Sequence, residues 1–389
     1  MKILLLNRSY YPHIGGIENS LYYLSREYKR MGHEVLILTQ EIKGEYPHRA
    51  EYADIITYPR YSGSKLFLPL LPLADKREIV SWIRDHKQEV EADFVVCRDP
   101  MLGLSYLEVF PKANIVYIPA VVIKYYNKGI RKAKSVKDFI KETLRYSQLK
   151  VEERQQKEIF ERAQRVLVFS KNVRKQLLNG NLCKEEKITV CHPGVADKFT
   201  HPEPAAARND RMVRFVFVGR LVAEKNLGML IDAFGQLQDK SKRLVLVGNG
   251  NQRGELENRV RELSLTDQVV FVGESNTPEK YYKEADFFVI PSSYESFGQV
   301  VIEALSSGVP VIGFSSIAGK TLTAIDELIV DGKTGFICKE FSIDSLRENM
   351  ERAAKVLCDG EKYADMKRMA TQFTKDHCSW SNLAKKCLE

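Results

Sequence analysis

Three features that would each point to a particular class of protein are missing from this sequence of 389 residues. Its longest apolar runs fall far short of the roughly 18 residues needed to cross a bilayer. Its seven cysteines include no Cys-x-x-Cys pair and are odd in number, which argues against a disulfide framework or a zinc site. No Gly-x-Gly-x-x-Gly fingerprint follows the first predicted strand, which argues against a hydride-transferring dehydrogenase.

The composition that remains is ordinary for a globular protein, with 44% apolar and 28% charged residues. A chain of this length has room for two domains, each with its own core. The segment Met1–Asn7 is too short for the core of a signal peptide and is predicted to form the first strand of a sheet. Together with the scattered cysteines, this leads us to expect a cytoplasmic protein with reduced thiols.

Apolar strand-like runs alternate with helical stretches throughout, which predicts an α/β protein with parallel sheets. The strands expected in the first half are Ile3–Leu6, Glu34–Leu38, Asp93–Cys97, Ile115–Ile118, Arg165–Phe169 and Ile188–Cys191. The helices expected between them cover about 16–31, 76–89 and 136–163. The strands expected in the second half are Val213–Val218, Leu244–Val247, Val269–Val272, Phe287–Ile290, Val309–Gly313 and Gly335–Ile337.

Four parts of the chain follow from this pattern. Residues 1–195 are expected to form one Rossmann-like domain, and residues 212–375 a second. Residues 196–211 contain two prolines and no periodicity, which predicts a linker. Residues 376–389 are expected to form a terminal helix that returns to the first domain.

Positive charge is concentrated in one segment, although the whole chain carries a net charge of +8. Residues 124–150 contain nine Lys and Arg, opposed by two acids and interleaved with four aromatic side chains. Such a segment suits an anionic membrane surface, but it also fits a phosphorylated acceptor or a solvated helix face. Nucleic acid is a poorer partner, because no recognised binding motif accompanies the charge.

The most informative stretch runs from Tyr294 to Ala304 and places Glu295 and Glu303 eight positions apart. A buried strand is expected before it, and a helix from about Gln299 after it. The free N–H groups of a helix N-terminus favour an anion, so this junction suits a phosphorylated, hydroxyl-rich ligand. By itself, the stretch also fits a capped helix with a solvated acid.

The Glu-x7-Glu spacing resembles that of retaining glycosyltransferases of family 4, which have the GT-B fold. Three further motifs appear in the order of that family: Gly15-Gly16, the segment Gly219–Asn226, and Gly248-Asn249-Gly250. The resemblance implies two Rossmann-like domains facing across a cleft, with a nucleoside-diphosphate sugar, most simply UDP-linked, as donor. It implies no metal and no other cofactor.

The resemblance also implies roles for residues of the second half. Arg220 and Lys225 would bind the diphosphate, as Arg and Lys geometry allows, although both also fit a solvated loop. Glu303 would accept hydrogen bonds from the ribose hydroxyls, and Glu295 would lie near the donor sugar. The remaining expected donor contacts are Gly219, Gly248, Gly250, Glu274, Ser296, Phe297, Gly298, Gln299 and Val300.

In the first half, Gly15 and Gly16 would let the backbone approach the donor phosphate or the acceptor at a helix N-terminus. The alternative is a turn that needs a positive φ. His13 is expected on the acceptor side. Asp99 either positions the acceptor hydroxyl or caps a helix before Pro100.

One departure from the family concerns the strand predicted at Ile115–Ile118. The family commonly has a His after that strand, where it contacts the donor sugar, and this chain reads Pro119-Ala120-Val121. The identity of the transferred sugar therefore stays open, and so does the question of whether this protein retains transferase activity.

The leading hypothesis is a retaining hexosyl- or N-acetylhexosaminyltransferase that acts on a cell-surface glycan or lipid-linked saccharide by same-face substitution. Its basic segment would place it peripherally on the inner face of the cell membrane. The alternatives are the same chemistry on a small soluble acceptor, and a GT-B partner subunit that binds without transferring.

Overall fold

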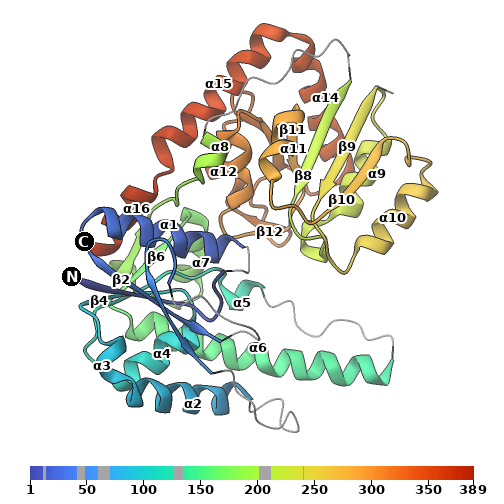
Figure 1. Ribbon diagram of the computed structural model, residues 1–389. Helices are drawn as coiled ribbons and strands as arrows, with labels where there is room; N and C mark the ends of the chain where they lie inside the picture. The colour runs from blue at the N-terminus through green and yellow to red at the C-terminus, as the bar shows by residue number, and fades with distance from the viewer. Residues whose placement is uncertain (12–14, 42–48, 60–70, 127–134, 201–211, 240) are drawn as a thin grey trace. The chain divides into compact units, whose positions relative to one another are not determined.

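The computed structural model describes residues 1–11, 15–41, 49–59, 71–126, 135–200, 212–239 and 241–389. These residues pack as two compact units. The first unit consists of Met1–Pro193 together with Trp380–Glu389, and the second unit is Gly194–Ser379. Each is built around one parallel sheet with helices on both faces (Figure 1), so the predicted α/β class and its two Rossmann-like sheets are confirmed.

The sheet of the first unit has seven parallel strands in the order β3-β2-β1-β4-β5-β6-β7. Its strands are β1 (Lys2–Leu6), β2 (Glu34–Gln40), β3 (Asp54–Tyr58), β4 (Phe94–Cys97), β5 (Ile115–Tyr117), β6 (Arg165–Val168) and β7 (Ile188–Val190). The helical segments are α1 (Gly16–Arg30), α2 (Leu71–Asp85), α3 (Lys87–Val90), α4 (Pro100–Val109), α5 (Ile123–Tyr126), α6 (Val136–Arg162), α7 (Lys171–Asn179), η2 (Glu185–Lys187) and α16 (Trp380–Leu388).

The sheet of the second unit has six parallel strands in the order β10-β9-β8-β11-β13-β15. Its strands are β8 (Val213–Val218), β9 (Lys242–Val247), β10 (Val269–Gly273), β11 (Phe287–Ile290), β13 (Val311–Phe314) and β15 (Gly335–Cys338), with β12 (Tyr294–Glu295) paired separately to β14 (Leu322–Thr323). The helical segments are α8 (Asp197–Thr200), η3 (Ala223–Lys225), α9 (Leu227–Gly235), α10 (Arg253–Glu262), α11 (Pro278–Glu284), α12 (Gln299–Ser306), α13 (Ile325–Leu328), α14 (Ile343–Cys358) and α15 (Gly360–His377).

The strand sequences explain why both sheets are buried. The central strands β4 and β11 are continuously apolar, and β1 is apolar after Lys2, as parallel strands covered on both faces must be. Alternate residues of each strand therefore enter different clusters: in β4, Val95 and Cys97 join one core, and Phe94 and Val96 join the other.

The terminal helix α16 belongs to the first unit. Trp380 and Leu383 lie in the same buried cluster as Leu21 and Leu24 of α1. The Trp380 ring stacks on that of Tyr23, with ring centroids 5.1 Å apart. The expected return of the last helix to the first domain is thus observed as direct packing of α16 on α1.

Several elements differ from the prediction. Strand β3 and helices α4 and α7 were not predicted, and the helix expected at 76–89 is two helices, α2 and α3. The segment expected to be a linker begins with a helical turn, α8, which packs on α12 in the second unit. The rest of that segment lies outside the described residues.

Candidate functional site

The loop after β8 carries the two predicted phosphate ligands, Arg220 and Lys225. Its first residue, Gly219, donates from its backbone to Val247 O of β9 at 2.9 Å. The Arg220 side chain is 73% exposed and its guanidinium lies 3.8 Å from the Glu224 carboxylate. This loop lies at the carboxyl ends of the strands, where ligands of open α/β sheets bind, so an exposed guanidinium there is available to an anion.

A second loop, the turn Gly248–Gly250 after β9, packs against the backbone of the first. A Cβ atom at Gly248 would lie 1.9 Å from Gly219 O, and one at Gly250 would lie 2.2 Å from Leu221 O. The Leu221 N–H donates to Asn249 O at 2.8 Å. Both glycines are therefore required for close contact between two loops, independently of any ligand.

Lys225 and Glu295, which are 70 positions apart in sequence, form an ion pair through Lys225 Nζ and Glu295 Oε1. Both side chains are largely buried. The same Oε1 atom accepts a hydrogen bond from Ser292 Oγ at 2.9 Å. Within the described residues no partner meets Oε2, so one oxygen of this carboxylate is anchored and the other is available to accept a hydrogen bond.

The junction between β12 and α12 has the strand–turn–helix form that was predicted. Gly298 precedes α12 with a φ of 98°, a conformation that glycine adopts without strain. Phe297 is buried, and the Gln299 side chain donates to Gly194 O at 3.0 Å. The Val300 carbonyl accepts from the Tyr282 hydroxyl at 3.2 Å. Of these expected donor contacts, Gln299 and Val300 thus already have partners in the protein, and Ser296 lies between them and Glu295.

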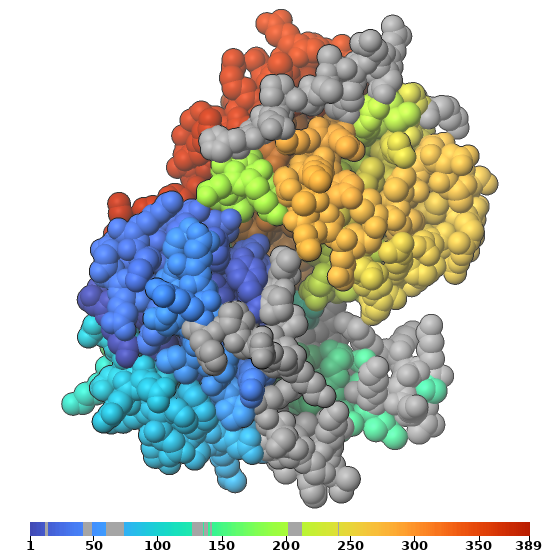
Figure 2. Space-filling model, viewed as in Figure 1, coloured from blue at the N-terminus to red at the C-terminus, as the bar shows by residue number. Residues whose placement is uncertain are grey.

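Glu303 lies one turn into α12 and is 9% exposed. Its burial raises its pKa from 4.5 to about 8; the positive charge of Lys198 opposes this shift and the negative charge of Glu279 adds to it. Lys198 pairs with Glu279 at 3.2 Å, and in Figure 2 the light-green α8 lies against the orange surface of α11. Glu274, expected near the base, is exposed just after β10.

In the first unit, Gly15 and Gly16 lie at the start of α1 as predicted. Gly15 is extended, with φ −159° and ψ 173°, and neither glycine has a positive φ. The alternative of a turn that needs positive φ is therefore wrong. A Cβ at Gly15 would lie 2.6 Å from Glu18 Oε2, and Ser9 Oγ donates to Glu18 Oε1 at 2.6 Å, so the Glu18 carboxylate occupies the space over Gly15.

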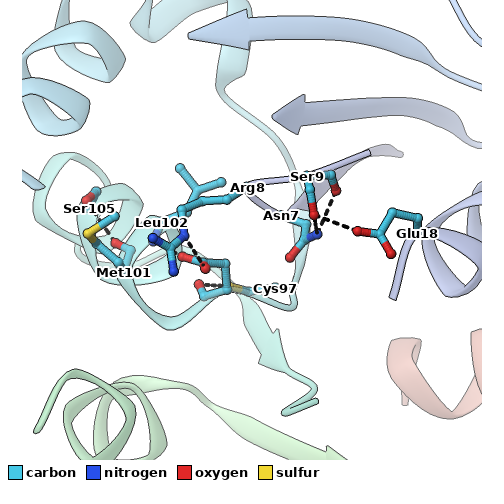
Figure 3. Close-up of polar contacts among 9 residues, drawn as sticks. Asn7, Arg8, Ser9, Glu18, Cys97, Met101, Leu102 and Ser105 are labelled. Carbon is cyan, nitrogen blue, oxygen red and sulfur yellow. Dashed lines mark hydrogen bonds and ion pairs between the residues drawn. The ribbon is translucent and has the colours of Figure 1, made fainter. Parts of the chain in front are cut away.

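Asp99 caps α4, which is the alternative that the Asp-Pro pair offered. Its Oδ1 accepts from the Leu102 N–H at 2.9 Å, and its Oδ2 accepts from Arg8 Nε at 2.6 Å (Figure 3). Because both oxygens are engaged, Asp99 orients Arg8 and is not a free base. The carboxylate also raises the pKa of Arg8, since the ion pair stabilises the charged guanidinium.

A pocket of about 490 Å³ opens beside this pair at the carboxyl ends of β1, β4 and β5. Its lining residues are Asn7, Arg8, Ser9, Ile17, Gln40, Glu41, Arg98, Asp99, Pro100, Tyr117, Ala120, Val121, Ile123 and Gln156. The pocket therefore includes the loop after β5, where the family's His is missing. His13 lies outside the described residues.

Sequence reasoning missed Gln156 of α6, which fixes that loop. Its Nε2 donates to Val121 O at 2.8 Å and to the Tyr117 hydroxyl at 3.1 Å, and its Oε1 accepts from the Ile123 N–H at 2.8 Å. No local pattern marks a helical glutamine as a loop anchor, so only the tertiary structure identifies it. Ser292 was also missed, although its position three residues before Glu295 was visible.

Two family models match this chain in succession. Residues 14–199 match Glycosyltransferase Family 4, and residues 201–373 match Glycosyl transferases group 1. An uncharacterized glycosyltransferase of Methanocaldococcus jannaschii is 30% identical over 234 residues, covering 57% of each chain. A capsular polysaccharide biosynthesis glycosyltransferase of Staphylococcus aureus is 30% identical over 203 residues, covering 48% of this chain and 51% of that one. The chain thus spans about half the length of the curated relatives that it matches.

Solved structures extend the similarity of fold to the whole chain. The Anabaena protein HepE, in complex with UDP and glucose, superimposes with a TM-score of 0.74 at 17% identity, covering 100% of this chain and 98% of that one. At this identity the likeness shows the fold alone, which is GT-B. With both family models matched in order along the chain, this protein belongs to the glycosyltransferases of group 1 and family 4.

Proposed function

We propose that this protein is a retaining glycosyltransferase that moves a hexosyl or N-acetylhexosaminyl group from a UDP-sugar to a hydroxyl of a cell-surface glycan or lipid-linked saccharide. The observation that carries the proposal is the Lys225–Glu295 ion pair at the carboxyl edge of a Rossmann-like sheet, with the exposed Arg220 in the same loop as Lys225. The UDP bound to HepE and the capsular polysaccharide role named for the S. aureus relative support the choice of donor and acceptor.

Arg220 and Lys225 would bind the diphosphate of the donor. A planar guanidinium matches two phosphate oxygens, and the ammonium adds a compact charge. Lys225 is largely buried, so its charge is weakly screened by solvent and acts strongly on the leaving group. These two cations would stabilise the diphosphate without a metal ion.

Two acidic side chains would orient the rest of the donor. Glu295 has its Oε1 held by Lys225 and Ser292, so its Oε2 would accept a hydrogen bond from a sugar hydroxyl. Glu303 would accept hydrogen bonds from the ribose hydroxyls. Because Lys225 neutralises Glu295, this carboxylate suits orientation better than covalent attack on the sugar.

The transfer would occur on one face of the sugar. The acceptor oxygen forms its bond to C1 while the bond from C1 to the diphosphate oxygen breaks. The bonding electrons stay with the diphosphate, and one of its oxygens takes the acceptor proton. This balance requires no further base, which agrees with the engagement of both Asp99 oxygens by Leu102 and Arg8.

The acceptor would bind in the pocket of the first unit. Arg8, Asn7 and Gln40 supply donors and acceptors for hydroxyl groups, and Ile17 and Val121 supply apolar surface for a sugar ring. Asp99 would contribute by fixing Arg8. A lipid-linked acceptor would also account for the basic segment 124–150, which we propose contacts an anionic membrane. No helix in the described ranges is both long and apolar enough to span a bilayer.

Calorimetric titration of UDP, GDP, ADP and dTDP without added metal tests the donor site. We expect UDP to bind, and Lys225→Ala to weaken binding by about tenfold or more, because a buried charge-assisted contact is lost. Lys333→Ala, which removes an exposed lysine from a turn of the same unit, is the matched control and should bind UDP normally.

The outcomes separate the alternatives. Equal binding by the wild type and Lys225→Ala would contradict the assigned site. Binding without transfer to any saccharide or small soluble acceptor would favour a non-catalytic subunit, the reading that the missing His supports. Transfer to a small soluble acceptor, with none to a saccharide, would contradict the proposed acceptor class but not the proposed donor or its chemistry.

A further inference from the structure

Asn226 connects η3 to α9 and has a left-handed backbone, with φ 49° and ψ 40°. Among the described residues, only two other non-glycine residues, Asn181 and Ser264, have a positive φ. Asparagine and glycine tolerate this conformation far better than most residues do. The backbone alone therefore explains why the residue after Lys225 is an asparagine or glycine, but it does not explain a choice between them.

The Asn226 side chain makes a connection that glycine lacks. Its Nδ2 donates to Glu224 O at 3.1 Å within its own loop, and to Pro291 O at 3.1 Å in the loop after β11. The Ser293 N–H donates to the same Glu224 O at 3.0 Å. The amide thus joins the loop of Lys225 to the loop of Glu295.

The position of this connection determines its effect. Lys225 directly precedes Asn226, and Ser292 and Glu295 follow Pro291 in the partner loop. The Lys225–Glu295 ion pair joins the same two loops, and the Ser292 hydrogen bond holds Glu295 within the second of them. Fixing the two backbones against each other leaves the lysine fewer alternative positions, which lowers the entropy lost when its ammonium binds a ligand.

We propose that Asn226 is a positioning residue, which acts through Lys225 to set the affinity for the nucleoside diphosphate and the rate of transfer. This inference rests on the proposed function and extends it to a residue that need not touch the substrate. It predicts that removing the Asn226 amide lowers UDP affinity and the transfer rate even when the left-handed backbone conformation is kept.

Two substitutions at Asn226 separate the effect of its side-chain amide from the effect of its backbone conformation, because Gly and Asp also adopt the left-handed conformation. Asn226→Gly removes the amide, and Asn226→Asp replaces the donor with a carboxylate facing two carbonyl oxygens. We expect UDP affinity and kcat/KM to be highest in the wild type, lower in Asn226→Gly and lowest in Asn226→Asp. The loss of two hydrogen bonds that act through Lys225 should make Asn226→Gly bind UDP about tenfold more weakly than the wild type. Asn181→Gly is the matched control and should bind UDP normally, because Asn181 has a left-handed backbone in the first unit and its side chain forms no hydrogen bond with the described residues.

A double-mutant cycle tests the path through Lys225. With Lys225→Ala already present, and UDP titrated to millimolar concentration, Asn226→Gly should weaken binding by less than about twofold. Equal losses in both backgrounds, or an Asn226→Gly protein that binds as tightly as the wild type, would overturn the assignment. Failure of the wild type to bind any of the four nucleotides would instead overturn the proposed function, and this inference with it.

Discussion

At the scale of single residues, burial controls the protonation of Glu303. The unfolded chain releases this proton near pH 4.5, whereas the folded protein retains it up to about pH 8. The folded state therefore binds more protons than the unfolded state throughout this window. By linkage, the contribution of Glu303 to stability is greatest below pH 4.5 and falls as the pH rises to about 8.

We predict that Glu303→Gln removes part of this pH dependence. The wild-type free energy of unfolding should fall relative to that of the variant between pH 5 and pH 8, with a slope of at most about 1.4 kcal/mol per pH unit. Urea denaturation of both proteins across this range measures the difference. Parallel curves would show that Glu303 is already ionised in the folded protein at neutral pH.

The residues of the candidate site were predictable to different degrees. Lys225 and Glu295 belong to local motifs whose spacing is visible in sequence, and the fold brings them into contact. Asp99 offered two readings, and the capping role was decided by the Leu102 N–H and by Arg8, 91 positions away. Arg8 and Gln156 had no local signal, because their roles depend on which strand and loop lie opposite them.

At the scale of elements, the glycines of the turn after β9 allow this turn to pack against the loop that carries Arg220 and Lys225. Gly248 has a φ of 131°, and any Cβ there would meet the backbone of Gly219. By contrast, a Cβ added at Gly254, in the first turn of α10, would have no atom within 4 Å beyond its chain neighbours and its own helix backbone. These two positions therefore separate a glycine required by packing from a glycine that is merely tolerated.

We predict opposite effects of alanine at these two positions. Gly248→Ala should destabilise the protein by about 2–5 kcal/mol, through backbone strain and displacement of the Gly219 loop, and should weaken UDP binding as well. Gly254→Ala should stabilise it by up to about 1 kcal/mol, because alanine favours helix. Thermal unfolding with and without UDP gives both quantities, and a harmless Gly248→Ala would contradict the packing of these loops.

The elements that the sequence pattern missed have physical explanations. Helix α4 is apolar on nearly every side because it is buried between α2 and α6, so it has no amphipathic period to detect. Its only signal was Asp99 followed by Pro100, a common helix start. Strand β3 is an edge strand with half-buried residues, which weakens the apolar run that marked the central strands.

At the scale of the whole molecule, much of the net charge of +8 comes from residues 124–150, which have nine Lys and Arg against two acids and include the start of α6. The N-terminal half of this helix projects beyond α2 and α4 in the first unit (Figure 1). There Phe139 is 54% exposed and Ile140 56% exposed. Exposed apolar side chains among lysines and arginines are typical of a surface that binds anionic lipid.

We predict that the protein binds vesicles of mixed anionic and zwitterionic lipid at low salt and is released as salt increases, since the attraction is screened. A Phe139→Ser, Ile140→Ser double variant should bind more weakly, because it loses the apolar insertion. Met369→Ser, which changes an apolar residue of α15 that is 38% exposed, is the control. Vesicle co-sedimentation of the three proteins measures this, and equal partitioning to purely zwitterionic vesicles would contradict the electrostatic contribution.

The packing of α16 on α1 has a consequence for synthesis. The first unit begins at Met1 but includes Trp380–Glu389, so the whole second unit is inserted between two pieces of the first. On the ribosome, residues 194–379 are synthesised before α16. Until α16 is made, the surface of α1 on which Trp380 packs stays exposed to solvent. The unit whose residues are made first is therefore the one whose core is completed last.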